Sequence, residues 1–217
     1  MLVLLPPSEG KAEPEAGEPV DLDALAFASE LSGHREAVLD AFNPALREAP
    51  AAPAAEVYSG VLFKRLQLPQ LPAKARRQVL IFSALWGVVR PDDRIPHYKL
   101  PPKTKLKKIG APAGFWRPAL VEALPDKEGE LIVDIRSGAY SSFWKPQQAT
   151  LLPVRAFTVK DGERKAVSHM AKASRGDVAR ALLRAKKAPK DPQGAAAIAE
   201  AAGLTIELND GSLDVIV

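Results

Sequence analysis

The chain has 217 residues, of which 47% are hydrophobic and 26% are charged, and it contains no cysteine. This length can bury a hydrophobic core without crosslinks, and the lack of cysteine excludes disulfides, zinc–thiolate sites, iron–sulfur clusters and cysteine nucleophiles. The run Met1–Leu5 is too short for a signal peptide and no apolar run reaches membrane-spanning length, so we expect a cytoplasmic protein without a membrane partner.

Charge is distributed unevenly along the chain. Residues 1–60 hold 11 acidic and 3 basic residues, residues 61–190 hold 27 basic and 10 acidic residues, and residues 191–217 hold five acidic residues and no basic one. A middle segment this basic projects a positive potential that attracts phosphates, nucleotides or nucleic acid. A solubilising surface explains most basic excesses, but it does not explain why the acidic residues are segregated to the two ends.

The first predicted element is a buried strand at residues 2–5, which is ended by prolines and Gly10. The loop Ser8-Glu9-Gly10-Lys11 lies at the C-terminal end of this strand, where α/β sheets usually bind ligands. Further along the chain, residues 22–29 and 37–42 have helical spacing. Residues 49–55 are predicted to be a linker. Residues 57–62 fit either a strand or a turn that enters a helix, and residues 73–78 are predicted to be a short helix.

A strand predicted at residues 79–83 leads into the segment with the clearest signs of a site. It is followed by Leu85-Trp86-Gly87-Val88-Val89-Arg90-Pro91 and then by Pro96-His97-Tyr98-Lys99. Gly87 permits a sharp turn because glycine accepts a positive φ, and Arg90 is always charged and must find an anion or solvent. These residue types are typical of a pocket wall. A long basic loop at residues 99–114 follows, with Lys99, Lys103, Lys105, Lys107 and Lys108.

The remaining elements complete a predicted α/β fold. They are a helix at 115–124, a strand at 131–135, a hairpin of strands at 154–160 and 165–170 around Asp161-Gly162, a helix capped by Ser174, a helix opened by Asp191-Pro192 and closed by Gly203, and a final hairpin of 204–208 and 213–217. Strands and helices in this order predict a mixed β-sheet covered by helices, in a single compact domain that spans residues 1–217.

Lys172 and Arg175 flank the predicted helix start at Ser174, where free N–H groups and the helix dipole favour a phosphate. Solvated cations at the end of a surface helix explain this segment equally well. Tyr58, Tyr98 and Tyr140 each lie in or beside a predicted loop and can stack on a base or donate a hydrogen bond, although lone tyrosines more often pack partly buried. His34, His97 and His169 show no metal-ligand spacing, so we predict neither a metal nor a cofactor.

Several segments together resemble the YaaA family of bacterial peroxide-stress proteins in their order and approximate spacing. They are Met1–Ser8, Val57–Gly60, Ser83–Pro91, Pro96–Lys99, Phe115–Trp116 and Ala171–Gly176. The resemblance covers nearly the whole chain, and its elements Y-S/T-G, S-x-L-Y/W-G-V-x-R-P and A-K-x-x-R-G are specific in combination. The loop Ser8-Glu9-Gly10-Lys11 departs from the S-P-A-K type loop of many members, and this chain is shorter than the longer members.

The resemblance implies a cytoplasmic protein that limits oxidative damage under hydrogen peroxide and is linked to lower free iron. It also implies DNA binding through a positively charged cleft on a mixed α/β fold with a helix-hairpin-helix-like element. The segment 174–203 and the turn Leu85-Trp86-Gly87 are rival candidates for that element. With no cysteine and scattered histidines, we expect an indirect link to iron rather than a tight iron site.

Two functions are open from the sequence. The first is binding of duplex or structured DNA, mainly through phosphates, by an anion site predicted from Ser8, Lys11, Tyr58, Gly60, Gly87, Arg90, Tyr98, Lys172 and Arg175. The alternative is an enzyme that acts on a small anionic nucleotide- or nucleoside-like substrate, with unassigned catalytic residues. In that case Lys11 or Lys172 can act as a base only if burial lowers its pKa.

The two functions make different demands on the structure. A concave pocket at the strand ends favours the enzyme, a broad open basic groove favours the DNA binder, and the two can coexist. In either case we expect Arg90 to meet Lys172 and Arg175 in space, with an anion or Glu9 between them, because three adjacent cations repel one another.

Overall fold

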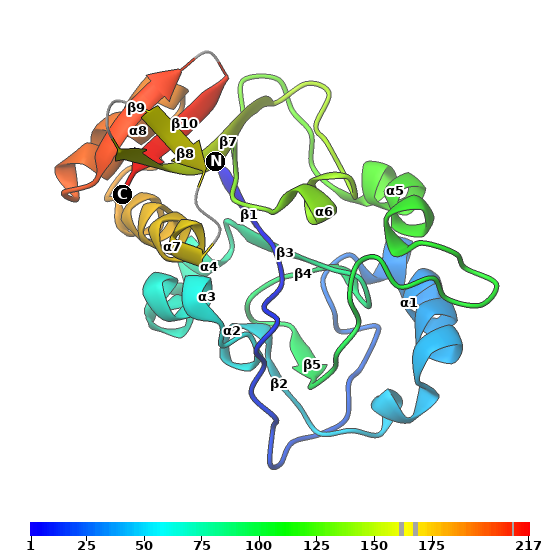
Figure 1. Ribbon diagram of the computed structural model, residues 1–217. Helices are drawn as coiled ribbons and strands as arrows, with labels where there is room; N and C mark the ends of the chain where they lie inside the picture. The colour runs from blue at the N-terminus through cyan, green and yellow to red at the C-terminus, as the bar shows by residue number, and fades with distance from the viewer. Residues whose placement is uncertain (161–162, 167–168, 210) are drawn as a thin grey trace.

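A mixed β-sheet of eight strands runs through the molecule (Figure 1). The computed structural model describes residues 1–160, 163–166, 169–209 and 211–217. The strands of the described chain are β1 (Leu2–Leu5), β2 (Ala51–Pro53), β3 (Val79–Ser83), β4 (Gly87–Val89), β5 (Arg94–Pro96), β6 (Leu131–Asp134), β7 (Thr150–Lys160), β8 (Glu163–Ala166), β9 (Thr205–Asn209) and β10 (Ser212–Ile216). The order across the sheet is β4-β3-β1-β6-β7-β10-β9, with β8 paired to β7, while β2 and β5 form a separate two-stranded sheet.

The centre of the sheet is parallel and its margins are antiparallel. β1 lies between β3 and β6 and is parallel to both, and β6 and β10 are parallel to β7. β4, β8 and β9 pair antiparallel with their neighbours. The C-terminal ends of β1, β3 and β6 therefore meet at one edge of the sheet, and the loops that follow these strands are brought together there.

Helices cover the sheet and pack against one another at its edges. The α-helices are α1 (Ala28–Phe42), α2 (Ala54–Val57), α3 (Val61–Leu66), α4 (Ala73–Arg76), α5 (Pro112–Ala123), α6 (Gly138–Ser141), α7 (His169–Arg184) and α8 (Pro192–Ala201), and two 3₁₀ turns cover Pro44–Arg47 and Leu68–Gln70. Helix α3 packs on α7, and α1 packs on α5. Figure 1 places β8, β9, β10 and α8 at one end of the molecule and α1 and α5 at the other. None of the helices in the described part of the chain is long and apolar enough to cross a membrane.

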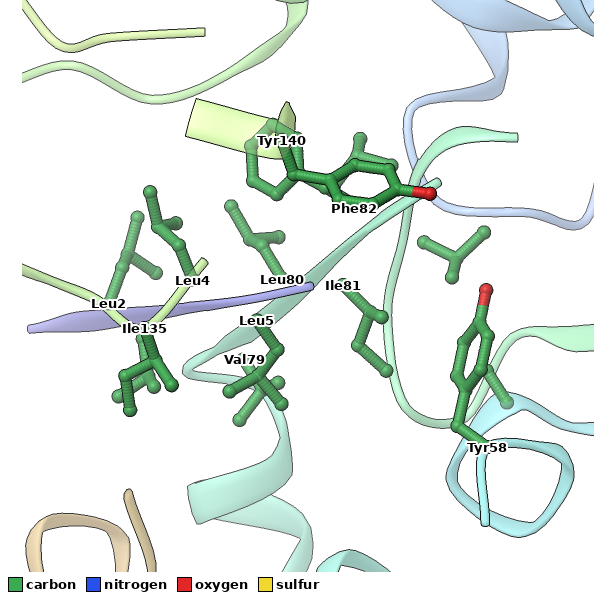
Figure 2. Packing of buried hydrophobic residues seen from close by; sticks show 14 of the residues in the cluster. Leu2, Leu4, Leu5, Tyr58, Val79, Leu80, Ile81, Phe82, Ile135 and Tyr140 are labelled. Atoms are coloured by element: carbon green, nitrogen blue, oxygen red, sulfur yellow. The ribbon is translucent and has the colours of Figure 1, made fainter. Parts of the chain in front are cut away.

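One hydrophobic core holds these layers together. Strands β1 and β3 contribute runs of buried residues, and Figure 2 shows Leu4, Leu5, Leu80 and Ile81 packed along them. The cluster extends on both sides of residues 49–55. The predicted α/β domain with a mixed sheet covered by helices is thus confirmed. The three tryptophans are core residues.

Four predicted elements are wrong in detail. The segments 22–29 and 37–42 are not two helices, because one helix, α1, begins at Ala28 and runs to Phe42. Residues 49–55 are not a linker, because Ala51–Pro53 form β2 and pair with β5. The second hairpin strand ends at Ala166 and not at 170, and α7 already begins at His169. The turn at Asp161-Gly162 lies outside the described residues. Ser174 does not cap a helix but lies inside α7, because Ala171, Ser174 and Val178 are buried at helical spacing along one continuous face.

Other local predictions are confirmed. The Asp191 side chain accepts a hydrogen bond from the Gly194 N–H at 2.7 Å and so caps α8. Gly203 follows that helix with a φ of 85°, and β9 and β10 form the final hairpin. Gly87 has a φ of 70°, and a side chain there would collide with the Trp116 ring. The turn at Leu85-Trp86-Gly87 joins two strands, so it is not a helix-hairpin-helix element.

A buried arginine ties α1 to the β3–β4 turn. Arg35 is fully buried, and its guanidinium donates hydrogen bonds to the carbonyls of Ala26 at 2.7 Å, Val88 at 3.0 Å and Trp86 at 3.3 Å. Burial lowers the pKa of Arg35 to about 10, and the nearby Asp93 carboxylate opposes this shift. The side chain is a structural cation that satisfies backbone carbonyls which no water reaches.

We predict that Arg35→Ala lowers the free energy of unfolding by about 3–5 kcal/mol, because it leaves buried carbonyls without their donor and removes the positive charge near Asp93. Urea denaturation measures this change. The matched control is Arg47→Ala, which removes a partly exposed pair with Asp40 at 2.8 Å and should change stability by less than about 1 kcal/mol. Equal effects of the two substitutions would contradict the structural role of Arg35.

Candidate functional site

A cavity of about 900 Å³ lies at the sheet edge where β1 and β6 end. The chain leaves β1 toward β3 on one side and later enters β6 on the other, so β1 marks the topological switch point of the sheet, where α/β proteins bind ligands. The lining comes from the loop after β1, the start of α3, the segment after β5, the loop around α6 and one face of α7. Its polar and charged side chains are Ser8, Glu9, Lys11, Tyr98, Lys99, Ser137, Tyr140, Lys172 and Arg175.

The loop after β1 is fixed against the segment that enters α3. The buried Ser8 Oγ accepts a hydrogen bond from the Gly60 N–H at 2.7 Å. Two backbone hydrogen bonds, Ser59 N–H to Gly10 O and Ala12 N–H to Val57 O, pair the two segments. A Cβ at Gly60 would lie 2.2 Å from Ser8 Oγ, so this close approach requires glycine. Ser8 and Gly60, both predicted as site residues, therefore shape one wall of the cavity.

Lys11 places its terminal amine inside this wall. Its Nζ donates a hydrogen bond to the Ser8 carbonyl at 2.6 Å and lies 4.4 Å from the centroid of the Tyr98 ring. Burial lowers the pKa of Lys11 to about 8, and the carboxylate of Glu9 opposes that shift. Burial has this effect because it disfavours the charged form of the amine. This lowered pKa is the condition under which Lys11 can act as a base.

A chain of buried, hydrogen-bonded hydroxyls fixes the Tyr98 ring beneath the Lys11 amine. The Tyr58 and Tyr98 hydroxyls are 2.8 Å apart, and the Tyr98 hydroxyl lies 2.7 Å from Ser83 Oγ. Ser83 Oγ in turn accepts the N–H groups of Leu85 and Trp86 at 3.1 Å each. Burial raises the pKa of Tyr98 to about 12 and that of Tyr58 well above its usual value, so both stay protonated near neutral pH.

Tyr140 enters the cavity from the loop after β6. Figure 2 shows its hydroxyl directed toward the same region as that of Tyr58. Burial raises the pKa of Tyr140. The loop is held by the buried pair Asp134 and Arg136, whose closest atoms are 2.8 Å apart, and Arg136 also donates to the Trp144 carbonyl at 2.9 Å.

Helix α7 supplies two cations to the opposite wall. Lys172 Nζ lies 4.0 Å from a carboxylate oxygen of Glu9, and its side chain is half exposed. Arg175 donates from Nε to the Val154 carbonyl at 3.1 Å, and burial lowers its pKa against the influence of Asp134. Both cations line the cavity. Helix α7 also lies very close to α3, since a Cβ at Gly176 would be 2.5 Å from the Leu62 carbonyl oxygen.

The structure gathers most of the predicted anion site and leaves two residues out. Ser8, Lys11, Gly60, Tyr98, Lys172 and Arg175 line the cavity, and Tyr58 lies directly behind Tyr98. Arg90 does not meet Lys172 and Arg175. Its guanidinium donates to the Arg77 carbonyl at the end of α4 and lies over the Phe27 ring at 5.4 Å, so this expectation was wrong. Gly87 packs on Trp116 and has a structural role.

Lys99, Ser137 and Tyr140 line the cavity but were not among the predicted site residues. The signal for Lys99 was present, since it adjoins Tyr98, whereas nothing in the sequence distinguishes Ser137. His97 lies at a second cavity of about 370 Å³ that shares Tyr98 and Lys99 with the first. Within the described ranges, no three His, Asp or Glu side chains gather in a way that can hold a metal ion.

Comparison with known proteins gives the family. The sequence model described as peroxide stress protein YaaA matches residues 23–205. The chain belongs to the YaaA family of peroxide stress proteins. A UPF0246 protein of Streptomyces coelicolor is 39% identical over 227 aligned positions, which cover 88% of this chain and 86% of that protein. A UPF0246 protein of Corynebacterium efficiens is 37% identical, with 97% of this chain and 96% of that protein covered.

The YaaA resemblance predicted from the sequence is therefore confirmed. The segments that carried it converge in three dimensions: Met1–Ser8, Val57–Gly60, Pro96–Lys99 and Ala171–Gly176 each contribute to or support the cavity wall. The segment Ser83–Pro91 lies behind that wall, with Ser83 holding Tyr98. The matched region begins at residue 23, so Ser8 and Lys11 precede it, whereas the Corynebacterium alignment extends over nearly the whole chain.

The shifted pKa of Lys11 has a measurable consequence for stability. Above pH 10.5 the amine is neutral in the folded and unfolded chains, and between about pH 8 and 10.5 the unfolded chain binds more protons. We therefore predict that the unfolding free energy of the wild type, relative to Lys11→Met, rises as the pH increases through this window and is lowest below pH 8. Urea denaturation at pH 7, 9 and 10.5 measures the difference, with Lys74→Met at an exposed position as the control. A difference that falls with pH would contradict the burial of Lys11.

Proposed function

We propose that this protein binds DNA through phosphate contacts at the cavity and its surroundings, and that it limits iron-dependent oxidative damage under hydrogen peroxide at the DNA itself. The observation that supports this most strongly is the convergence of Lys11, Lys99, Lys172 and Arg175, from three separate segments, on one cavity. The family membership supplies the peroxide-stress context.

The charge balance of the cavity favours an anionic ligand. Against four cations, the described lining residues contribute one carboxylate, that of Glu9, whose side chain is 95% exposed. Cations brought together in a partly buried site repel one another, and a bound phosphate group relieves that repulsion. Partial burial also strengthens the contacts of Lys11 and Arg175, because these two cations have lost part of their water.

Basic residues continue beyond the cavity in two exposed segments. Lys103, Lys105, Lys107 and Lys108 are exposed and follow directly after the cavity-lining Pro101 and Pro102. The connection between α7 and α8, which lies within the predicted segment 174–203, carries exposed Lys186, Lys187 and Lys190. Contacts of these flexible ammonium groups with backbone phosphates favour binding that is insensitive to base sequence.

We predict that duplex DNA binding weakens steeply with salt, with a log–log slope of about −0.9 for each phosphate neutralised. Changing Lys103, Lys105, Lys107 and Lys108 together to Ala should weaken binding equally for unrelated sequences and reduce the slope. Fluorescence anisotropy at several salt concentrations measures both quantities. Lys74→Ala, an exposed change on α4, is the control. No binding at low salt, or binding that does not depend on salt, would contradict the proposal.

A second candidate function has its own observation in its favour. The site is a concave cavity, the form that favours an enzyme for a small nucleotide- or nucleoside-like anion, and it contains a lysine with a pKa of about 8. A cavity of this volume accepts one nucleotide. The two functions coexist if the cavity receives one unit of a nucleic acid strand.

Mononucleotides separate the two candidates. If the cavity takes a free nucleotide, we predict that a deoxynucleoside monophosphate at 100 times its Kd stabilises the folded protein by about 2.7 kcal/mol. Lys172→Gln should reduce this stabilisation, and Lys74→Gln should leave it unchanged. Differential scanning fluorimetry measures the shift in Tm. DNA binding without any nucleotide-dependent shift would leave the DNA binder as the only supported function.

A further inference from the structure

The amine of Lys11 differs from the other cations of the cavity in how it is held. It is anchored to the Ser8 carbonyl at 2.6 Å and lies over the Tyr98 ring, on a loop that two backbone hydrogen bonds fix to the segment before α3. Lys172 projects from α7 with a half-exposed side chain. A restrained amine with few accessible orientations is suited to bond formation, because its reactive nitrogen is already positioned.

The environment of Lys11 also maintains a reactive fraction of the amine. A lysine with a pKa of about 8 is neutral in about a quarter of the molecules at pH 7.5, whereas an ordinary lysine is almost fully protonated. A neutral primary amine is a nucleophile, and the electrophile it typically attacks is a carbonyl carbon. The cations Lys172 and Arg175 in the same cavity restrict the substrate to carbonyl compounds that carry phosphate groups.

We propose that Lys11 is the amine nucleophile of a lyase reaction on DNA, in which its Nζ attacks the C1′ aldehyde of an abasic deoxyribose. The inference rests on the proposed DNA binding and adds a reaction to it. An abasic site is an anionic carbonyl compound: the opened sugar carries an aldehyde between two phosphates. Oxidative attack on DNA bases generates such sites, so the substrate also suits a peroxide-stress protein.

Each step of the reaction balances with groups in the cavity. The lone pair of Lys11 Nζ forms a bond to C1′, and the aldehyde oxygen leaves as water, which takes one proton from the amine and one from solvent, to give a protonated imine. The carboxylate of Glu9 then takes a proton from C2′, and the electrons of that C–H bond expel the 3′-phosphate and form a C2′–C3′ double bond. Water hydrolyses the imine and restores the amine. No oxidant or metal is consumed.

The flanking side chains have defined roles in this scheme. Lys172 and Arg175 bind the phosphates on either side of the opened sugar and stabilise the charge that develops on the leaving phosphate. The hydroxyl of Tyr140, which lines the cavity, stays protonated because burial raises its pKa, so it is available as a hydrogen-bond donor to the aldehyde oxygen. Lys172 lies 4.0 Å from Glu9 and keeps that carboxylate at the cavity mouth.

Borohydride trapping tests the proposal directly. A labelled duplex with one abasic site is incubated with the full-length protein and sodium borohydride, which reduces an imine to a stable amine. We expect a covalent protein–DNA adduct with the wild type and with Lys74→Arg, and none with Lys11→Arg or Lys11→Met. Lys11→Arg retains a cation and an N–H donor on the same loop but cannot form an imine. Peptide mapping should locate the adduct at Lys11.

A parallel measurement separates this inference from the DNA binding on which it rests. Anisotropy with a tetrahydrofuran abasic analogue, which has no aldehyde, should show binding by the wild type, and it gives the protein concentration that saturates the DNA with each variant, at which trapping is then compared. Absence of binding by the wild type overturns the proposed function. Binding without trapping, or trapping that persists in the folded Lys11→Arg variant, overturns the lyase inference alone. Glu9→Gln should still be trapped but should cut the strand about 100-fold more slowly, and unchanged cutting would remove Glu9 from the scheme.

Discussion

The hydroxyl chain from Ser83 through Tyr98 to Tyr58 is the constraint on which the site depends. It joins the end of β3, the segment after β5 and the end of α2, which are otherwise separate in the sequence. All three groups are buried, so an incomplete chain would leave a hydroxyl without a partner in a place that water does not reach. The Tyr98 ring is thereby fixed beneath the Lys11 amine, and the position of that amine is set by the sheet rather than by its own flexible side chain.

Two close backbone contacts complete the cavity and place its cations in different surroundings. Gly60 lets the loop after β1 approach α3, and Gly176 lets α7 approach α3 from the other side. Lys11 is thus held within the loop wall, whereas Lys172 stands at the rim with a half-exposed side chain. Burial changes the acid–base behaviour of the inner amine. One edge of the sheet therefore carries an amine with a lowered pKa next to cations that are suited to binding phosphate.

The sequence predicted the sheet and the loops better than the convergence of side chains. Apolar runs such as Leu2–Leu5 and Val79–Ser83 identify strands because both faces are buried, and Asp191-Pro192 identifies a helix start through capping chemistry. Ser174 was wrongly predicted as a helix cap because serine also occurs inside helices. The buried residues Ala171 and Val178 show the helical period on either side of it. Tyr140 reaches the cavity through tertiary packing, which the local sequence does not show, whereas Lys99 could be inferred from its neighbour Tyr98.

The wrong prediction for Arg90 shows that a motif can support the walls of a cavity without lining it. The Arg90 guanidinium donates a hydrogen bond to the carbonyl of Arg77, the C-cap residue of α4. In the same motif, Ser83 holds Tyr98, Gly87 admits the Trp116 ring, and the carbonyls of Trp86 and Val88 bind the buried Arg35. The most recognisable segment of the chain therefore builds the support behind the cavity wall. Ser83 reaches the cavity through Tyr98, and the other residues named here support the fold, so we expect substitutions in this segment to act first on stability.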